Sequence, residues 1–206
     1  MLTFQISLHI NDLCVLEYIK NKLNCGHISI SGSKCHYFVN DQNSLIKVII
    51  PIFNSVKLNS SKYYQFIVFE KAVNLFKENK HLSPEGKLEM IHLHKEMKRD
   101  NYYLAPSPEI FNNLHLTKYW LGGFTDGDGS FSFGNYKPRF KYENHIKELE
   151  LFKRIKEFLN IESNINITKA RNNRPNANIT VVLDINDIVS LKNKNCTSFF
   201  FVFKIK

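Results

Sequence analysis

Two acidic residues, Asp126 and Asp128, end a short run of small and apolar residues, and a glycine follows each of them. Residues 118–125 predict a helix that begins after Thr117, because threonine is a common N-cap residue. The glycines are typical of positions just past a helix C-terminus. Both carboxylates would then lie at the negative end of the helix dipole, which costs roughly 0.3–1 kcal/mol each unless a cation compensates. The pattern therefore indicates a divalent cation with oxygen ligands.

Two other structures compete with a metal site in this segment. A polar turn is one, because Asp and Gly are common turn residues. A calcium-binding loop is the other, since Asp126, Asp128 and Ser130 match its first three ligand positions. The loop fails further on: Phe131 stands where it needs glycine, and Lys137 stands where it needs a bidentate glutamate. The residues alone leave the polar turn and the metal site as alternatives.

Residues 121–131, Leu-Gly-Gly-Phe-Thr-Asp-Gly-Asp-Gly-Ser-Phe, resemble the signature of the LAGLIDADG homing endonucleases. Five positions are identical and a sixth is a common small-residue variant: Leu121, Gly123, Asp126, Asp128 and Gly129, with Gly127 as the variant. The departures are mild: Gly122 for alanine, Phe124 for leucine and Thr125 for isoleucine. The resemblance implies a signature helix whose packing face includes Leu121, Gly122, Gly123 and Asp126.

The composition is that of a globular protein with an anionic partner. The chain has 206 residues, 43% of them hydrophobic, which is enough for one large domain or two small ones. The net charge of +9 favours nucleic acid as the partner. An anionic membrane surface is the alternative, but no stretch reaches the roughly 18 apolar residues that span a bilayer.

Cysteine spacing and amino-acid usage give further information. The four cysteines lack the paired spacing of a zinc module, so we expect reduced thiols. A zinc site across a hairpin is the alternative, from Cys25, His27, Cys35 and His36. No targeting peptide is visible. Asn, Ile, Lys, Phe and Tyr, which AT-rich codons specify, are abundant, as in organelle genomes.

The sequence repeats itself without gaps at a fixed offset. Phe4, His9, Ile10, Leu13, Ile19, Lys20, Leu23 and Asn24 recur as Phe140, His145, Ile146, Leu149, Ile155, Lys156, Leu159 and Asn160. In both copies the apolar residues lie on one helical stripe. Each copy therefore predicts a strand followed by an amphipathic helix.

More strands are predicted beyond each helix, at residues 27–31 and 34–39 in the first copy and at 164–170 and 177–183 in the second. Both copies then contain an Asp-x-Asn-x-(Leu/Ile) segment, at residues 41–45 and 184–188. The first copy continues into a helix near residues 62–80, and two prolines mark a linker. We expect domains at residues 1–105 and 118–206, joined by residues 106–117.

This organisation resembles a double-motif member of the family. The resemblance implies an α+β fold of two pseudo-symmetric αββαββα half-domains whose signature helices pack along the pseudo-twofold axis. The first half has no signature helix here, and the second loses the pattern after Leu191. We therefore expect a chain truncated at both ends, with a second chain or fragment as the source of the missing helix.

The resemblance also assigns chemistry. Mg²⁺ held by carboxylates can activate water and neutralise charge at a scissile phosphate. By resemblance, Asp128 is the catalytic metal ligand, and the backbone near Gly127 adds a carbonyl. Lys62 is similar to the family's active-site lysine, which stabilises charge near that phosphate. A solvated lysine at a helix start is the alternative for Lys62.

Residues on the predicted strands are candidates for DNA contact in the major groove. Gln5 resembles a base-contacting position, and glutamine can pair with adenine through two hydrogen bonds. The basic candidates are Lys34, Lys137, Arg139, Lys141, Lys169, Arg171 and Arg174. Leu8 stands where the family often has a polar residue, and its counterpart in the second copy is Asn144.

The resemblance therefore implies a site-specific, Mg²⁺-dependent endonuclease for double-stranded DNA, of the intron-homing type. We expect a mitochondrial protein that by itself, as this fragment, cleaves DNA poorly or not at all. One alternative is a maturase on the same fold, which binds intron RNA and assists splicing. The other is a degenerate remnant without activity.

Overall fold

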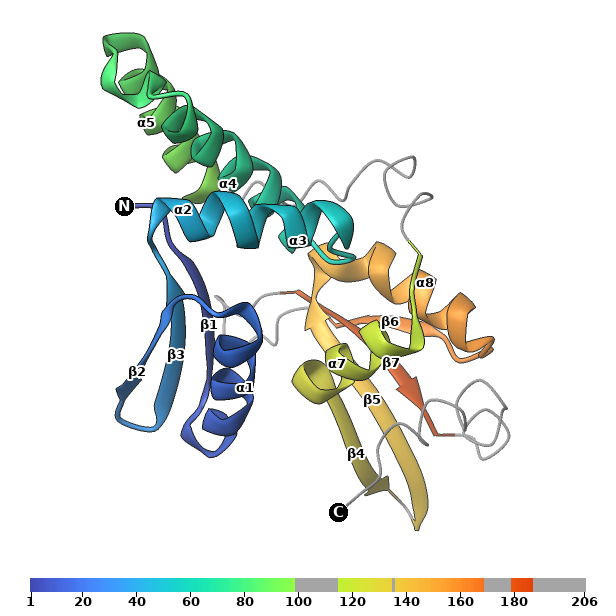
Figure 1. Ribbon diagram of the computed structural model, residues 1–206. Helices are drawn as coiled ribbons and strands as arrows, with labels where there is room; N and C mark the ends of the chain where they lie inside the picture. Colours follow the sequence, from blue (N-terminus) through green and yellow to red (C-terminus); the bar gives the residue numbers. More distant parts are fainter. Residues whose placement is uncertain (99–114, 135, 169–178, 187–206) are drawn as a thin grey trace. The chain divides into compact units, whose positions relative to one another are not determined.

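The computed structural model describes the chain except for residues 99–114, 135, 169–178 and 187–206. The chain forms two compact units (Figure 1). Unit 1 comprises residues 1–58 and 62–99, and unit 2 comprises residues 59–61 and 100–206. Among the described residues, every helix is too short or too polar to cross a membrane.

Unit 1 is built on a three-stranded antiparallel sheet in the order β1-β3-β2. Its strands are β1 (Phe4–His9), β2 (His27–Ser31) and β3 (Lys34–Val39), and α1 (Leu13–Leu23) joins the first two. The helices that follow are α2 (Gln42–Ser44), α3 (Ile50–Ser55), α4 (Lys62–Lys77) and α5 (Pro84–Lys98), with a π-helical turn (Leu45–Ile49) between α2 and α3. The helix expected near residues 62–80 is therefore confirmed, ending at Lys77.

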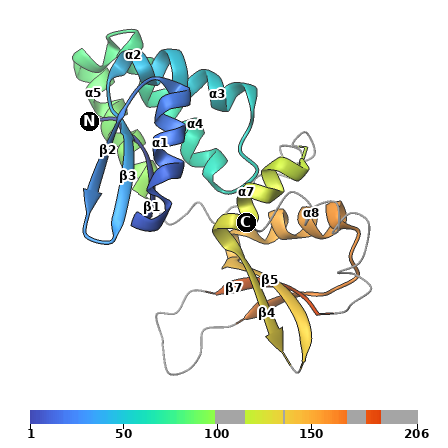
Figure 2. The same cartoon turned by 60° about the horizontal axis from the view of Figure 1, so that its bottom comes forward.

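Unit 2 contains a four-stranded antiparallel sheet in the order β4-β5-β7-β6. Its elements are α7 (Lys118–Asp128), β4 (Gly129–Gly134), β5 (Lys137–His145), α8 (Leu149–Leu159), β6 (Ile165–Thr168) and β7 (Thr180–Ile185). Helices α7 and α8 cover one face of this sheet (Figure 2). The other face carries polar side chains.

The sequence repeat corresponds to a repeated strand, turn and helix, and its repeated histidine and asparagine residues are helix caps. His9 and His145 each accept a hydrogen bond at Nδ1 from the backbone N–H two residues later, which starts a 3₁₀ turn before the helix. Asn24 and Asn160 end the helices with φ of 50° and 51°, the left-handed conformation that asparagine tolerates better than most residues. The predicted strand and amphipathic helix of each copy are confirmed.

Each unit has its own apolar core. In unit 1, Leu16, Tyr37 and Val39 are fully buried between the sheet and the helices. In unit 2, Tyr142 of β5 and Phe152 of α8 are fully buried. Burying a side chain of this size stabilises a fold by roughly 1.5–3 kcal/mol, so these residues fix the helices on the sheets.

The structure corrects the role that we expected for the glycines around α7. Gly127 lies inside the helix rather than past its end, and Gly129 follows with φ of −85°, which is not a left-handed conformation. A Cβ on Gly129 would lie 2.6 Å from the carbonyl oxygen of Thr125. Gly129 is therefore required by close packing against the helix end, and not by a positive φ.

The two Asp-x-Asn segments are alike in sequence but not equivalent in structure. Asp41 caps α2, where Oδ1 accepts from the N–H of Ser44 at 2.7 Å, and this bond lowers the pKa of Asp41. Asp184 instead lies within β7. Because Phe4 pairs with Val39 and Phe140 pairs with Ile185, the position equivalent to Asp184 is Phe38.

Candidate nucleic-acid interface and metal site

Helix α7 brings Asp128 to the start of a strand. Thr117 caps the helix by accepting from the N–H of Trp120 at 3.1 Å. The helix ends at Asp128, and β4 begins with the next residue. The side chains of Asp126 and Asp128 are exposed, so both carboxylates are accessible.

A buried hydrogen-bond chain holds α7 on the sheet. Thr125 donates from Oγ1 to the carbonyl oxygen of Leu121 at 2.8 Å. Because a threonine hydroxyl has one proton, the short contact with Tyr142 requires the tyrosine hydroxyl to donate to Thr125. The ring of Phe124 packs against Tyr142 at 5.4 Å between centroids. These contacts fix the end of the helix that carries Asp128.

The electrostatics at Asp128 favour a cation. Desolvation by neighbouring atoms raises the pKa of its carboxyl above the ordinary value of 3.8, and the carboxylate also lies at the negative end of the helix dipole. One carboxylate is compatible with Mg²⁺, which usually keeps several waters and uses one or two carboxylates together with substrate phosphates. The described residues contain no group of three or more His, Cys, Asp or Glu side chains that could hold a metal ion by themselves.

Alternate residues of the four strands form the exposed face of the unit 2 sheet, which we call the unit 2 face. The register places Lys141 opposite Ser130 and Asp184, and Glu143 opposite Val182. The polar residues of this face are Ser130, Ser132, Lys137, Arg139, Lys141, Glu143, Asn166, Thr168, Thr180 and Asp184. A face of this kind, with both donors and acceptors, has the chemistry needed to contact base edges and phosphates.

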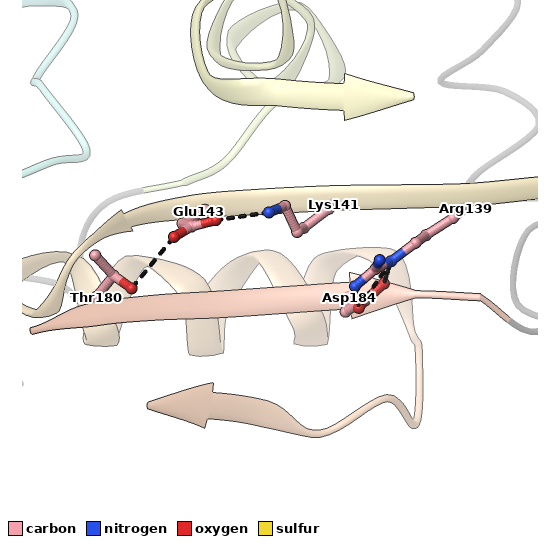
Figure 3. Close-up of polar contacts among 5 residues, drawn as sticks. All are labelled: Arg139, Lys141, Glu143, Thr180 and Asp184. Carbon is pink, nitrogen blue, oxygen red and sulfur yellow. Dashed lines mark hydrogen bonds and ion pairs between the residues drawn. The ribbon is translucent and has the colours of Figure 1, made fainter. Parts of the chain in front are cut away.

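Carboxylates neutralise two of the predicted basic residues on the unit 2 face. Arg139 forms a two-pronged ion pair with Asp184, and Lys141 lies 2.6 Å from Glu143, to which Thr180 also donates (Figure 3). Asp184 and Glu143 were not among the residues that we predicted for the site. The period-2 alternation of β5 could have revealed Glu143, whereas Asp184 required the pairing of β5 with β7.

The exposed face of the unit 1 sheet has a different chemistry. Gln5 donates from Nε2 to Ser7 Oγ at 2.8 Å, and Ser7 Oγ lies 2.8 Å from His36 Nδ1. The ring of Phe38 stacks with those of His36 and His27, with centroids 5.7 and 5.5 Å apart. Gln5 is exposed on β1 and Lys34 is exposed on β3, as expected for residues that contact a partner.

Lys62 is the first residue of α4, and its Nζ donates to Gln65 Oε1 at 3.1 Å. Both side chains line a cavity of about 380 Å³ within unit 1. Gln5 lines the same cavity, whose other walls include Phe4, Ile6, Phe53, Phe66 and Phe69. Lys62 and Gln5, which were predicted from different parts of the sequence, therefore lie at one cavity.

The remaining predicted residues fall into two groups. Leu121 and Gly122 of α7 are buried, whereas Gly123 and Gly127 are exposed. Lys169, Arg171 and Arg174 lie outside the described residues. The alternative zinc site gains no support from its cysteines, because Cys25 contacts Tyr37 and Cys35 is buried against the carbonyl oxygens of Leu8 and His9.

The comparisons with known proteins agree with this geometry. The family model described as LAGLIDADG endonuclease matches residues 1–73. The fold is similar to that of the I-SmaMI LAGLIDADG homing endonuclease bound to cleaved DNA, with a TM-score of 0.80 and 23% identity over 98% of this chain and 72% of the other. The chain thus resembles the LAGLIDADG endonucleases in the sequence of residues 1–73 and in its fold. The resemblance predicted from residues 121–131 is thus confirmed, as is an α+β fold with two antiparallel sheets.

Other similar proteins extend the comparison. Meganuclease I-AabMI bound to uncleaved DNA has a TM-score of 0.77 and 24% identity over 99% of this chain and 75% of the other. Probable intron-encoded endonuclease 2 of Neurospora crassa is 29% identical over 184 residues, which are 76% of this chain and 41% of that protein. Probable intron-encoded endonuclease Cox1-I1b of Schizosaccharomyces pombe is 28% identical, over 63% of this chain and 33% of that protein. The chain thus spans about two fifths of the Neurospora relative and one third of the fission yeast one.

Proposed function

We propose that this chain is the DNA-recognising and metal-binding part of a site-specific, intron-encoded endonuclease that hydrolyses double-stranded DNA. The observation that carries the proposal is the continuity of α7 and β4. A helix ends in an exposed carboxylate at Asp128, and two residues later Ser130 belongs to the polar unit 2 face. Duplex bound on that face would bring a phosphate close to the carboxylate.

Asp128 is the proposed ligand of a divalent cation, Mg²⁺ in the cell, and a backbone carbonyl near Gly127 is the proposed second protein ligand. Such a cation supplies an activated water and neutralises charge on the phosphate. The exposed carboxylate with a raised pKa fits that role, because a cation removes the cost of its negative charge.

Lys62 is proposed to stabilise negative charge near the scissile phosphate. Its position at the start of α4 is compatible with this role, because the amino group donates to the neutral side chain of Gln65 and the lysine lines the cavity. The basic residues of the sheets and Gln5 are proposed to contact the duplex, as are Lys169, Arg171 and Arg174.

The two units are proposed to be αββαββα half-domains, with the domain limits expected from the sequence. Unit 2 follows this order as α7, β4, β5, α8, β6 and β7. Unit 1 follows it from β1 onwards, because β1 corresponds to β5 through the equivalence of Phe4 and Phe140. Among the described residues of unit 1, no strand pairs with the outer edge of β1.

A helix and strand like α7 and β4 are proposed to complete unit 1 from outside residues 1–99. In unit 2, α7 packs on Tyr142 of β5 and buries it, together with Phe140. The equivalent residues of β1, Ile6 and Phe4, are only half-buried and line an apolar groove between β1, α1 and α3. A signature helix would cover this groove, and a strand would pair with the free edge of β1.

The groove can be tested with a peptide that repeats residues 118–134. We expect it to bind the 206-residue chain and to raise its unfolding midpoint, because ligands of the folded state stabilise it. Replacing Ile6 by lysine should abolish binding, while the exposed substitution Ser29→Lys should not. Equal binding by both variants would contradict an occupant in this groove.

The proposed function is tested by DNA cleavage with Mg²⁺ in the presence of that peptide. Nicking or cleavage of one duplex sequence among many supports the endonuclease. Binding of structured RNA in preference to duplex, without cleavage, would favour the maturase. A mitochondrial location is proposed because a relative in Saccharomyces cerevisiae, 25% identical over 74% of this chain, is described as a mitochondrial protein.

A further inference from the structure

Arg139 on β5 is held by a carboxylate on the neighbouring strand β7. Its Nε lies 2.8 and 2.9 Å from the two carboxylate oxygens of Asp184, and Nη2 also donates to Oδ2. The side chain of Asp184 is 16% exposed and that of Arg139 is 43% exposed. The carboxylate is therefore less exposed than the guanidinium, and the arginine side chain reaches from β5 to Asp184 on the neighbouring strand (Figure 3).

These bonds use only one side of the guanidinium. Arginine has five N–H donors in a rigid plane. The contacts with Asp184 occupy Nε and one N–H of Nη2. The outer edge, formed by Nη1 and the second N–H of Nη2, takes part in none of them. This is the edge that pairs with O6 and N7 of guanine through two parallel hydrogen bonds in the major groove.

We propose that Asp184 is a positioning residue, which presents the outer edge of Arg139 to one guanine and so makes the pair a determinant of one G·C base pair in the target. The inference rests on the proposed function as a DNA-binding protein. A free arginine loses rotamer freedom when it binds, whereas this one is already ordered by the ion pair.

The carboxylate also disfavours phosphate as the partner of Arg139. A phosphate at the outer edge would bring a second negative charge close to Asp184, while O6 and N7 of guanine carry no net charge. The neighbouring Lys141 is also paired with a carboxylate, that of Glu143 on the same strand. This part of the unit 2 face is thus suited to reading bases, and the excess positive charge that binds phosphates is carried elsewhere on the chain.

Unit 1, the other copy of the repeat, lacks this ion pair. The positions that correspond to Arg139 and Asp184 are Thr3 and Phe38 in unit 1. The pair is therefore a property of the unit 2 face and not a requirement of the fold, which is what a residue pair for sequence specificity should show.

To test this, the 206-residue chain is used to select duplexes from a randomised library. The affinity of the chain for the selected site is then measured with each of the four base pairs at every position. We expect one strongly preferred guanine that Arg139→Ala loses. Asp184→Asn should keep binding but lower the preference at that same position by roughly tenfold. Glu143→Gln, the matched control that removes the neighbouring carboxylate, should leave that position unchanged.

Two further measurements separate positioning from a structural role. Arg139→Lys keeps the charge but not the two-donor edge, so it should lose the guanine preference while the dependence of affinity on salt stays the same. Asp184→Asn should unfold at about the temperature of the unaltered chain. A guanine preference that survives Asp184→Asn, or a loss spread over all positions, would overturn the inference. A chain that enriches no duplex at all would instead refute DNA recognition, and the inference with it.

Discussion

At the scale of single residues, Thr125 shows how α7 accommodates a polar side chain at a buried position. The position is 3% exposed, where an unpaired hydroxyl would be costly. Thr125 avoids that cost by donating to Leu121 within its own helix and accepting from Tyr142 on β5. The buried threonine thus contributes a specific link between α7 and the sheet.

This link can be measured with a double-mutant cycle. Thr125→Val and Tyr142→Phe should each lower the free energy of unfolding by about 1 kcal/mol, the usual net value of a hydrogen bond. If the two hydroxyls bond to each other, the double variant should lose less than the sum of the two single losses. Denaturant unfolding of the four proteins measures the coupling, and strict additivity would show that the hydroxyls do not interact.

Asp128, the proposed metal ligand, is expected to lower the stability of the folded chain at neutral pH. Its folded pKa is raised, so its contribution to stability is fully present below the ordinary value of 3.8 and is lost as the pH rises through the folded pKa. Asp128→Asn, which does not titrate, should therefore raise the unfolding midpoint near neutral pH. We expect a gain of roughly 0.3–1 kcal/mol from the helix dipole, or about 1–4 °C.

The same substitution tests the metal ligand without any activity. Added Mg²⁺ should raise the midpoint of the unaltered chain and not that of Asp128→Asn, because only the former binds the ion. Asp126→Asn is the matched control and should keep the Mg²⁺ response. The midpoint difference between the unaltered chain and Asp128→Asn should also vanish in acid.

At the scale of elements, the sequence was most informative where local chemistry decides the structure. The repeated His and Asn residues predicted a repeated unit, and the structure shows why: each is a cap that starts or ends a helix. Strands at residues 27–31 and 34–39 were predicted with the observed limits. Alternation and turn residues determine these elements without help from distant parts of the chain.

The asparagine caps predict a distinctive mutational pattern. Asn160→Gly should leave stability nearly unchanged, whereas Asn160→Ala should cost about 1 kcal/mol, because alanine is strained at φ of 51° and glycine is not. Asn24 offers the same pair of substitutions in unit 1. Thermal unfolding of the four variants measures both, and an alanine as stable as glycine would contradict the cap assignment.

The pairing of residues far apart in the chain could not be predicted from the sequence. The likeness of residues 41–45 and 184–188 suggested equivalent segments, but strand register assigns Asp41 to a helix cap and Asp184 to β7. Similarly, no local pattern links residues 59–61 to α8. Yet Ser61 donates its N–H to the buried carboxylate of Glu148, and Arg154 donates to Asn59 at 3.0 Å, all within unit 2. Such contacts depend on the tertiary fold.

At the scale of the whole molecule, the repeat preserves the framework and varies the exposed faces. Gln5 and Ser7 of unit 1 occupy the positions of Lys141 and Glu143 in unit 2. Neutral hydrogen-bonding side chains thus replace charged pairs. Because the caps and the core stripe are repeated and the exposed residues are not, the two faces should select different half-sites, and the target should not be a palindrome.

Cleavage is the property that depends on the whole assembly. The proposed ligand Asp128 lies on one helix, and the described residues contain no group of three or more potential metal ligands. A two-metal clamp on the attacking and leaving oxygens needs ligands on both sides of the phosphate. We therefore predict that the 206-residue chain by itself binds its selected duplex but cleaves it poorly. The peptide that repeats residues 118–134 should restore Mg²⁺-dependent cleavage by supplying a second signature helix.

The contributions to cleavage of Asp128 in the chain and of the equivalent aspartate in the peptide can then be measured separately. Asp128→Asn in the chain should lower the restored cleavage by roughly 10²-fold or more while DNA affinity is kept, since the loss is one of charge stabilisation. The peptide with asparagine at the position of Asp128 should bind the groove equally well and restore nothing, which makes it the matched control for peptide binding alone. Efficient double-strand cleavage without the peptide, or cleavage insensitive to Asp128→Asn, would show that the metal site is completed in another way.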